Sequence, residues 1–137
     1  MKFTNYNIKG VKSVFTPEIY SWQYIEKSFK DIIKSYGYDE IKLALLEKEK
    51  LFIKTLGKNS DIIKKELFSL SNNNIILLPE GTTSCAKYLL LNGFLRNKQN
   101  RNVWYISSMF RKENTQLGRN RLFNQIGIES FDKKKYY

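Results

Sequence analysis

The chain has 137 residues, of which 42% are hydrophobic, 15% aromatic and 27% charged, a composition typical of one globular domain. Lysine and arginine outnumber the acidic residues by 24 to 13, so the net charge is +11, which favours a polyanionic partner such as nucleic acid or a nucleotide. The lack of histidine excludes His-ligated zinc sites, a Ser-His-Asp triad and a Cys-His dyad, and the single cysteine, Cys85, excludes an internal disulfide framework.

Neither a membrane segment nor a secretory signal is indicated by the sequence. The longest apolar runs, at 75–78 and 89–91, are far shorter than the ~20 residues that a membrane span needs. The first five residues lack the apolar segment of a secretory signal. We therefore expect a cytoplasmic protein with no membrane partner.

The first predicted element is a helix between Thr16 and Gly37. Thr16 provides a cap, Pro17 occupies the first turn, and Glu18 places an acid at the positive end of the helix dipole. Apolar residues then recur at helical spacing, namely Ile19, Trp22, Ile25, Phe29, Ile32 and Ile33. Gly37 is expected to end the helix, because glycine suits the left-handed conformation of a C-cap.

Short strands and helices are expected next along the chain. Residues 38–47 alternate apolar and polar positions, which predicts a strand, and residues 48–56 predict a short helix. An Asn-Ser-Asp sequence caps a further short helix over 59–67. A turn at 71–74 then leads into an apolar strand at 74–78, which a proline stops.

The last part of the chain predicts a helix followed by a hairpin. Either Thr82 or Thr83 caps a helix that runs through residue 91, and a polar loop is expected at 96–102. Residues 103–110 and 121–131 read as two strands joined by a charged loop, which predicts an antiparallel pair. The order of elements therefore predicts an α+β fold with a mainly antiparallel sheet flanked by helices.

Pro79-Glu80-Gly81-Thr82 is the first candidate site, since it places a carboxylate and a hydroxyl on a turn between a strand and a helix. On spacing alone, the commoner interpretation is a helix cap with an acid at the N-terminal end. A ligand-binding turn is the other interpretation.

Arginines define the second candidate site, because most of the positive charge is lysine and three of the five arginines fall between residues 111 and 121. In Phe110-Arg111-Lys112-Glu113, an arginine at the end of a strand can present its planar fork to a phosphate. Gly118-Arg119-Asn120-Arg121 is a basic loop tip that a hairpin would bring close to the same ligand. An Arg–Glu pair on an edge strand and a solvated loop are the commoner interpretations.

Gln125 and Glu129 form the third candidate site. They stand four apart in a predicted strand and therefore share a face with Phe123 and Gly127. A polar pair among aromatic residues suits a small polar ligand with an ammonium group, and a purely structural role is the equal alternative. Cys85 is expected to be buried filler, since no base accompanies its thiol.

Taken in order, these segments resemble the N-terminal catalytic region of the histidyl-tRNA synthetases, which are class II aminoacyl-tRNA synthetases. The resemblance covers residues 9–131, nearly the whole chain. It is carried by Lys9-Gly10-Val11-Lys12 with Thr16-Pro17-Glu18 as the opening, Tyr36-Gly37-Tyr38-Asp39-Glu40-Ile41 with Glu47 as motif 1, Pro79-Glu80-Gly81-Thr82 as the histidine-binding turn, and residues 103–131 as motif 2.

The resemblance implies a histidine–tRNA ligase, which activates histidine with ATP to histidyl-adenylate and transfers the histidyl group to tRNA-His. It implies one partial class II catalytic domain over residues 1–137, with motif 1 at about 36–47, motif 2 at about 103–131 and no anticodon-binding domain. ATP with Mg²⁺ is the implied cofactor. The implied partners are tRNA-His, L-histidine and either a second copy or a completing chain, and no metal site built by the protein is implied.

The resemblance also implies a role for each candidate residue. Arg111 is the implied catalytic residue, because its charge would meet the α-phosphate as negative charge builds in the transition state. The implied ATP contacts are Arg111, Glu113 at the adenine amino group, Phe123 stacked on the base, and Arg119 and Arg121 at the phosphates or the tRNA acceptor end. The implied histidine contacts are Glu80, Gly81, Thr82, Gln125 and Glu129. Two carboxylates are expected there, since a buried ammonium is costly unless it is paired.

The sequence departs from the family pattern in residues and in length. Leu78 and Asn114 stand where arginines are usual, Ala44 stands at the motif 1 proline, and Asn124 stands where histidine is common. Motif 3 and the segment with a second catalytic arginine have no counterpart. We therefore interpret the chain as a truncated or split catalytic core and expect weak or absent adenylation from the isolated chain. A sheet that stopped after motif 2 would also keep an unpaired edge and an uncovered apolar face.

Two other classes of protein fit the same residues. One is a non-catalytic relative, such as the regulatory subunit of ATP phosphoribosyltransferase, which keeps the fold and can bind histidine. The other is an RNA-binding or dimerisation fragment derived from a synthetase, whose tRNA binding would weaken steeply with salt.

Overall fold

The computed structural model of the chain describes residues 6–70, 74–96 and 101–131. Its central feature is a hairpin of two ten-residue strands, β5 (Arg101–Phe110) and β6 (Leu122–Phe131), which pair antiparallel over their whole length. The two-residue strand β1 (Asp39–Glu40) pairs parallel with β5, so the order in this sheet is β1-β5-β6. The predicted antiparallel hairpin is confirmed.

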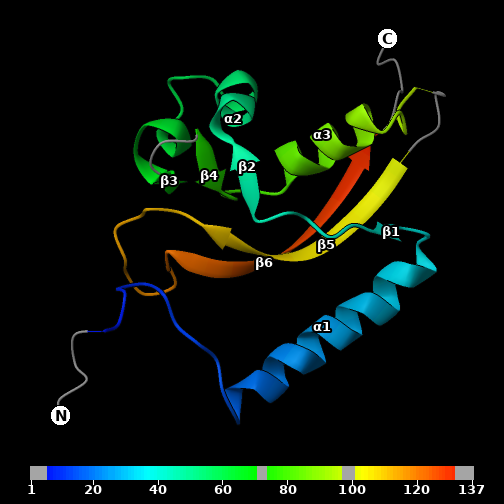
Figure 1. Cartoon of the computed structure of the whole chain (residues 1–137). Helices are drawn as coiled ribbons and strands as arrows, with labels where there is room; N and C mark the ends of the chain where they lie inside the picture. The colour runs from blue at the N-terminus through cyan, green and yellow to red at the C-terminus, as the bar shows by residue number, and fades with distance from the viewer. Residues whose placement is uncertain (1–5, 71–73, 97–100, 132–137) are drawn as a thin grey trace.

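Helices lie on both sides of this hairpin (Figure 1). Helix α1 (Glu18–Ser35) runs along one side, and α3 (Thr82–Leu91) lies on the other. Both helices are confirmed, and the backbone of Gly37 takes the expected left-handed conformation just after α1, with φ +71°. The hairpin therefore has two different faces, one toward α1 and one toward α3.

A second sheet lies on the α3 side of the hairpin (Figure 1). It contains β2 (Leu46–Lys48), β4 (Ile75–Leu77) and β3 (Ser69–Leu70), all antiparallel, in the order β2-β4-β3. Helix α2 (Glu49–Leu56) and the π-helical turn η1 (Ile62–Glu66) connect β2 to β3. This small sheet places the end of β4 directly before the candidate turn at residues 79–82.

Backbone hydrogen bonds join the small sheet to the hairpin. The Phe110 N–H donates to the Leu78 carbonyl at 2.8 Å, and the Lys112 N–H donates to the Glu66 carbonyl at 2.6 Å. The end of β5 is thereby held against the end of β4. Because Arg111 follows β5 and Glu80 follows β4, two candidate sites that are distant in sequence become neighbours.

The hydrophobic core fills the space between the hairpin and the elements on the α3 side. It consists of Phe52, Ile76, Leu78, Cys85, Leu89, Val103, Tyr105 and Met109, all of them buried. These residues come from α2, β4 and the residue after it, α3 and β5, so the apolar faces of all four elements close on one another.

The face of the hairpin toward α1 is less completely covered than the face toward α3. Phe29 meets Trp104 edge to face with ring centroids 5.4 Å apart, and Ile33 is buried beside them along the helix. On the neighbouring strand, however, Ile128 opposite Trp104 and Ile126 opposite Ile106 remain 50% and 37% exposed. Within the described residues β6 is also an edge strand, so the expected open edge and partly uncovered apolar face are both present.

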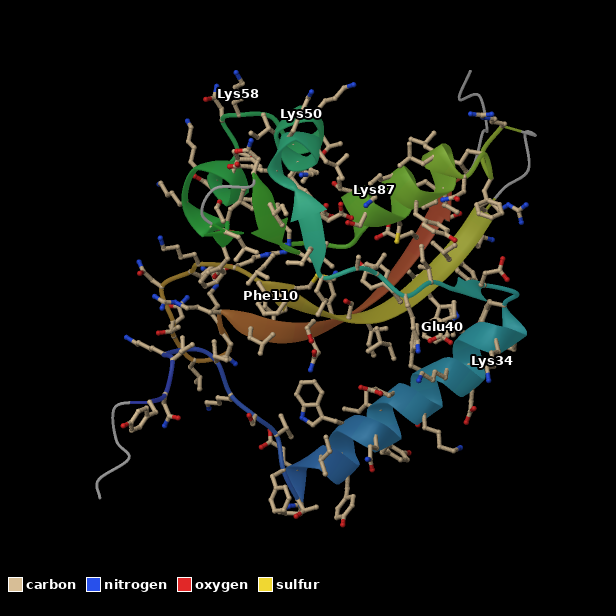
Figure 2. The ribbon with its side chains drawn as sticks, in the orientation of Figure 1. Lys34, Glu40, Lys50, Lys58, Lys87 and Phe110 are labelled. Atoms are coloured by element: carbon tan, nitrogen blue, oxygen red, sulfur yellow. The ribbon has the colours of Figure 1, made fainter. Side chains whose placement is uncertain are left out.

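A buried carboxylate ties α3 to the small sheet. Glu47 of β2 is 7% exposed, accepts a hydrogen bond from the Ser84 hydroxyl at 2.9 Å, and pairs with the Lys87 ammonium. Figure 2 shows Lys87 between α3 and β2. Since a buried charge that loses its partner is strongly destabilising, this pair holds the direction of α3 relative to β2.

The single strand predicted over 38–47 is wrong. The structure instead has β1 and β2 in two different sheets, with an extended segment between them in which the Ile41 N–H donates to the Trp104 carbonyl at 2.9 Å. Alternation of side chains continues through this region, but the backbone changes its pairing partner. Neither the change of partner nor the parallel pairing of β1 leaves a signal in a sequence pattern.

Several smaller predictions also need correction. The helix expected over 59–67 is the π-helical turn η1, the loop expected at 96–102 gives way to β5 at Arg101, and the strand β3 was not predicted. No threonine caps a helix with its side chain, since α1 and α3 have Pro17 and Gly81 at their caps. The part of the predicted turn at 71–73 and the loop residues 97–100 lie outside the described residues.

Among the helices of the described residues, none combines the length and the apolar character that crossing a bilayer requires.

We expect Phe52→Ala to lower the free energy of unfolding by about 3–5 kcal/mol, because it leaves a cavity in the core at a fully buried site. Urea denaturation would measure the change. Phe15→Ala is the matched control, since Phe15 is 81% exposed and its loss should change stability by less than about 0.5 kcal/mol. Equal effects of the two substitutions would contradict the assignment of Phe52 to the core.

Candidate functional site

The predicted site residues gather into two clusters on the α3 side of the hairpin. The first, called the carboxylate cluster, consists of Glu80, Thr82, Gln125 and Glu129. The second, called the arginine cluster, consists of Arg111, Glu113, Arg119, Arg121 and Phe123. Each cluster combines residues that are far apart along the chain.

Glu80 caps helix α3. Its carboxylate accepts the backbone N–H of Thr82 at 2.8 Å and the backbone N–H of Thr83 at 3.0 Å. The capping interpretation of the turn is therefore confirmed, with Gly81 as the N-cap residue and the preceding acid, rather than a threonine, accepting the first N–H groups of the helix. An anion is also stabilised at this position by the positive end of the helix dipole.

The Thr82 hydroxyl is available to the site because Glu80, and not Thr82, accepts the first backbone N–H groups of α3. The Thr82 hydroxyl donates to Glu129 Oε1 at 2.7 Å, which joins the first turn of α3 to β6. The two carboxylates, Glu80 and Glu129, thereby lie on either side of Thr82. The first and third candidate sites, treated separately in the sequence, are one site in the structure.

Gln125 and Glu129 point to the same face of β6, as the strand period predicted. Tyr105 lies between them on the neighbouring strand, since it is paired with Gly127 in the hairpin. The Gln125 side-chain amide donates to the Tyr105 hydroxyl at 3.4 Å. Tyr105 was not among the predicted site residues, although an aromatic residue opposite a glycine in the predicted hairpin was a signal that could have found it.

The ring of Tyr105 fits between two glycines. A Cβ atom added at Gly81 would lie 2.2 Å from its Cζ, and one added at Gly127 would lie 2.1 Å from the same atom. Neither distance is compatible with a side chain larger than hydrogen. Gly81, predicted as a histidine-binding residue, therefore has a steric role at the base of the site.

The carboxylate cluster carries negative charge that the described chain does not neutralise. Within residues 6–70, 74–96 and 101–131, no ion pair involves Glu80 or Glu129. Lysines such as Lys50 and Lys58 project from the α2 side, away from the hairpin (Figure 2). In a chain of net charge +11, two unpaired carboxylates side by side mark a place for a cationic group.

The arginine cluster forms around Glu113. Arg111 Nη1 lies 3.9 Å and Arg119 Nη1 lies 3.7 Å from the two carboxylate oxygens of Glu113. The Arg121 Nε–H donates to the Glu113 backbone carbonyl at 3.2 Å. Two guanidinium groups thus pair with one carboxylate and a third bonds the backbone of the same residue, which leaves an excess of positive charge suited to phosphate groups.

The loop between β5 and β6 brings these arginines together. The Arg111 N–H donates to the Arg121 carbonyl at 2.9 Å, so the loop closes directly beyond the last pair of the hairpin. The Arg121 and Leu122 N–H groups both donate to the Gly10 carbonyl, which anchors the N-terminal segment to the loop. The predicted proximity of the basic tip to Arg111 is therefore confirmed.

Arg111 links the arginine cluster to the carboxylate cluster. Its Nε–H donates to the Pro79 carbonyl at 2.9 Å, one residue before Glu80. Its guanidinium lies over the Phe123 ring, 5.2 Å from the centroid. One face of Phe123 is thus occupied by Arg111, whose Nη1 also faces the Glu113 carboxylate.

No metal cage is present among the described residues, since no group of three or more cysteine, aspartate or glutamate residues there is placed to hold an ion. Magnesium that enters with a nucleotide needs only one or two protein carboxylates, because the phosphates supply other ligands. Two cavities, of about 310 and 290 Å³, lie beside β1 and beside the start of α1. Of the predicted site residues, only Phe123 lines either of them.

Cys85 lies under the carboxylate cluster and is fully buried, as expected for a structural thiol. Burial, with smaller contributions from Glu129 and Glu80, raises the pKa of Cys85 from 9.0 to about 12. The thiol therefore stays protonated, and it offers no nucleophile to the site.

The chain was compared with known proteins, and the histidyl-tRNA synthetase family profile matches residues 10–136. The histidine–tRNA ligase of Caldicellulosiruptor saccharolyticus is 42% identical over 129 residues, which are 92% of this chain and 31% of that protein. The histidine–tRNA ligase of Buchnera aphidicola subsp. Baizongia pistaciae is 42% identical over 126 residues, 90% of this chain and 29% of that protein. The chain thus spans about 30% of the length of these curated relatives.

Solved structures show the same fold at low identity. The apo S. aureus histidyl-tRNA synthetase has a TM-score of 0.68 at 22% identity, over 89% of this chain and 28% of that one. A Bacillus halodurans structure, described as an ATP phosphoribosyltransferase regulatory subunit/histidyl-tRNA synthetase, has a TM-score of 0.73 at 22% identity, over 95% and 33%. The predicted α+β fold of class II synthetase type is confirmed.

We expect stability to fall as the pH rises above about 9, because the unfolded chain releases the Cys85 proton at its ordinary pKa whereas the folded chain keeps it to about 12. Each such group contributes a slope of at most about 1.4 kcal/mol per pH unit. Urea denaturation from pH 8 to 10.5 should show a shallower fall for Cys85→Ala than for the parent protein. Leu89→Ala is the control, since it opens the same core without removing a titratable group. Equal slopes for Cys85→Ala and the parent would contradict the raised pKa.

Proposed function

The chain belongs to the histidyl-tRNA synthetase family, and on that premise we propose that it forms part of a histidine–tRNA ligase. In the proposed reaction, ATP and L-histidine give histidyl-adenylate and pyrophosphate, and the histidyl group then passes to tRNA-His. Because the chain spans about 30% of its curated relatives, the activity is proposed for the protein that carries these residues.

One observation carries this proposal. Two carboxylates without a cationic partner in the described chain lie next to a cluster of three arginines, and the Arg111–Pro79 hydrogen bond joins the two groups. Adenylation brings together a cationic ammonium and an anionic triphosphate. A site with adjacent negative and positive halves is complementary to both substrates at once.

The carboxylate cluster is proposed to bind histidine. Glu80 and Glu129 would share its ammonium group, because each carboxylate oxygen keeps a lone pair beyond the hydrogen bond that it already accepts. Thr82 would hold Glu129 in place, and Gln125 would add a polar contact from β6. Because Gly81 has no side chain, Tyr105 would be able to lie beneath the ligand.

The arginine cluster is proposed to bind ATP, which enters with Mg²⁺. Arg111 would place its Nη groups on the α-phosphate, where charge accumulates during attack by the histidine carboxylate. Arg119, whose side chain is 64% exposed, would reach the outer phosphates or the acceptor end of tRNA, with Arg121 beside it. Glu113 would accept the adenine amino group, and the free face of Phe123 would stack on the base.

In this proposal residues 1–137 form one partial class II catalytic domain, with motif 1 at about 36–47 and motif 2 at about 103–131. Pairing of two copies through motif 1 and a cytoplasmic location belong to the same proposal, since they rest on the family. The exposed Ile126 and Ile128 and the open edge of β6 support a further chain segment or subunit against this sheet.

A second candidate function is histidine binding without adenylation, as in a regulatory subunit. One observation favours it, because Leu78 stands where the family usually has an arginine and is fully buried in the core. The site therefore has one cation fewer than expected. Histidine-dependent ATP–pyrophosphate exchange by the complete protein would separate the two candidates, since only a ligase catalyses it.

We expect Glu129→Gln to raise the KM for histidine by about tenfold or more, because the amide keeps the shape of the side chain but loses the charge that would pair with the ammonium. ATP–pyrophosphate exchange on the complete protein measures this KM. The matched control is Glu49→Gln on α2, outside both clusters, which should leave it unchanged. A histidine KM within about twofold of the parent for Glu129→Gln would count against the assigned role.

We expect Arg111→Ala to slow adenylation by about 10²-fold or more, because one donor to the developing phosphate charge is lost. Arg111→Lys should rescue only part of the rate, since lysine keeps the charge but not the planar fork. The exposed Arg96 offers a control as Arg96→Ala. Single-turnover formation of histidyl-adenylate would measure the rates, and a loss below about twofold for Arg111→Ala would refute the role.

A further inference from the structure

We infer that Tyr105 is a positioning residue of the amino-acid site, which holds Gln125 and Glu129 of β6 at a set distance from the Glu80 turn. The inference rests on the proposed function, because it takes the carboxylate cluster as the place where histidine binds. Tyr105 itself lies beneath the cluster and is fully buried, so it would act through its neighbours rather than by touching the substrate.

The position of the Tyr105 ring is determined sterically. The ring contacts the backbone of Gly81 on the turn before α3 and the backbone of Gly127 on β6, so that it separates the two elements that carry the carboxylates. A Cβ at either glycine would lie within 2.3 Å of Cζ or the hydroxyl oxygen. Close packing on both sides leaves the ring a single position, and this fixes the location of the Tyr105 hydroxyl.

The hydroxyl at that location lies beside both polar residues of β6. It accepts a hydrogen bond from the Gln125 side-chain amide at 3.4 Å, and the charge of the Glu129 carboxylate acts on it. Burial, together with the charge of Glu129, raises the pKa of Tyr105, so the phenol keeps its proton and remains a donor at all physiological pH values. The two polar residues of β6 are therefore held from different elements, Glu129 by Thr82 of α3 and Gln125 by Tyr105 of β5.

A purely structural role would not need this hydroxyl. The surrounding core is apolar, with Leu78, Cys85 and Met109 in the same cluster, and phenylalanine would fill the same volume without a buried polar group. A buried hydroxyl destabilises a fold unless it is hydrogen-bonded, and here the hydroxyl is bonded by Gln125, which belongs to the carboxylate cluster. The Tyr105 hydroxyl therefore has a role in the site, whereas the Tyr105 ring has a role in the fold.

Tyr105→Phe tests the inference because it keeps the ring and removes only the hydroxyl. On the complete protein, we expect the KM for histidine in ATP–pyrophosphate exchange to rise about tenfold. The KM for ATP should stay within about twofold, and the thermal unfolding midpoint should not fall. Tyr88→Phe is the matched control, since Tyr88 is exposed on α3, stacks on Phe94 and lies away from the site.

A second measurement needs no substrate. In the ligand-free protein, the side-chain amide NMR signals of Gln125 should move in Tyr105→Phe and stay in place in Tyr88→Phe. A histidine KM within about twofold of the parent, or equal rises in the KM values for histidine and ATP with a lower unfolding midpoint, would overturn the inference. If the parent protein does not use histidine, the proposed function fails. The Gln125 signals test the positioning role of Tyr105 independently of that outcome. If they do not move in Tyr105→Phe, the positioning role is overturned.

Discussion

The ring of Tyr105 can occupy its place only because residues 81 and 127 have no side chain. One of these glycines belongs to the turn that begins α3 and the other to β6, so a single aromatic ring sets the separation of a helix and a strand. The polar residues of the site lie on these two elements. Their relative positions are therefore a consequence of core packing, which is stiff, rather than of loop conformation, which is not.

The site depends on opposite charges that are adjacent but do not neutralise each other. Glu80 is held by two backbone N–H groups at the start of α3, where the helix dipole favours an anion. Arg111 is held by the Pro79 carbonyl and by the face of Phe123. Arg111 pairs with Glu113 of its own cluster and not with Glu80, so the negative and positive halves stay separate. Such a preorganised arrangement does not have to be rebuilt when substrates bind.

Helix α3 connects the site to the rest of the fold. Its first turn carries Thr82, which binds Glu129, and its middle carries Ser84 and Lys87, which bind the buried Glu47 of β2. The helix is thus fixed at one end by the hairpin and along its length by the small sheet. A change in the buried ion pair would move the N-terminal end of α3, and with it the cap formed by Glu80.

The sequence by itself determined the local structure and the chemistry of the chain. Helical periodicity predicted α1, an apolar and aromatic run predicted β5, alternation predicted β6, and the residue types of Glu80, Arg111 and Glu129 indicated which groups carry charge. These features depend on neighbours along the chain. The tertiary structure decided what depends on long-range contact, namely the split of 38–47 between two sheets, the meeting of Thr82 with Glu129 across 47 residues, and the closure around Tyr105. Such contacts leave no periodic signal, because the two partners are brought together only when the core packs.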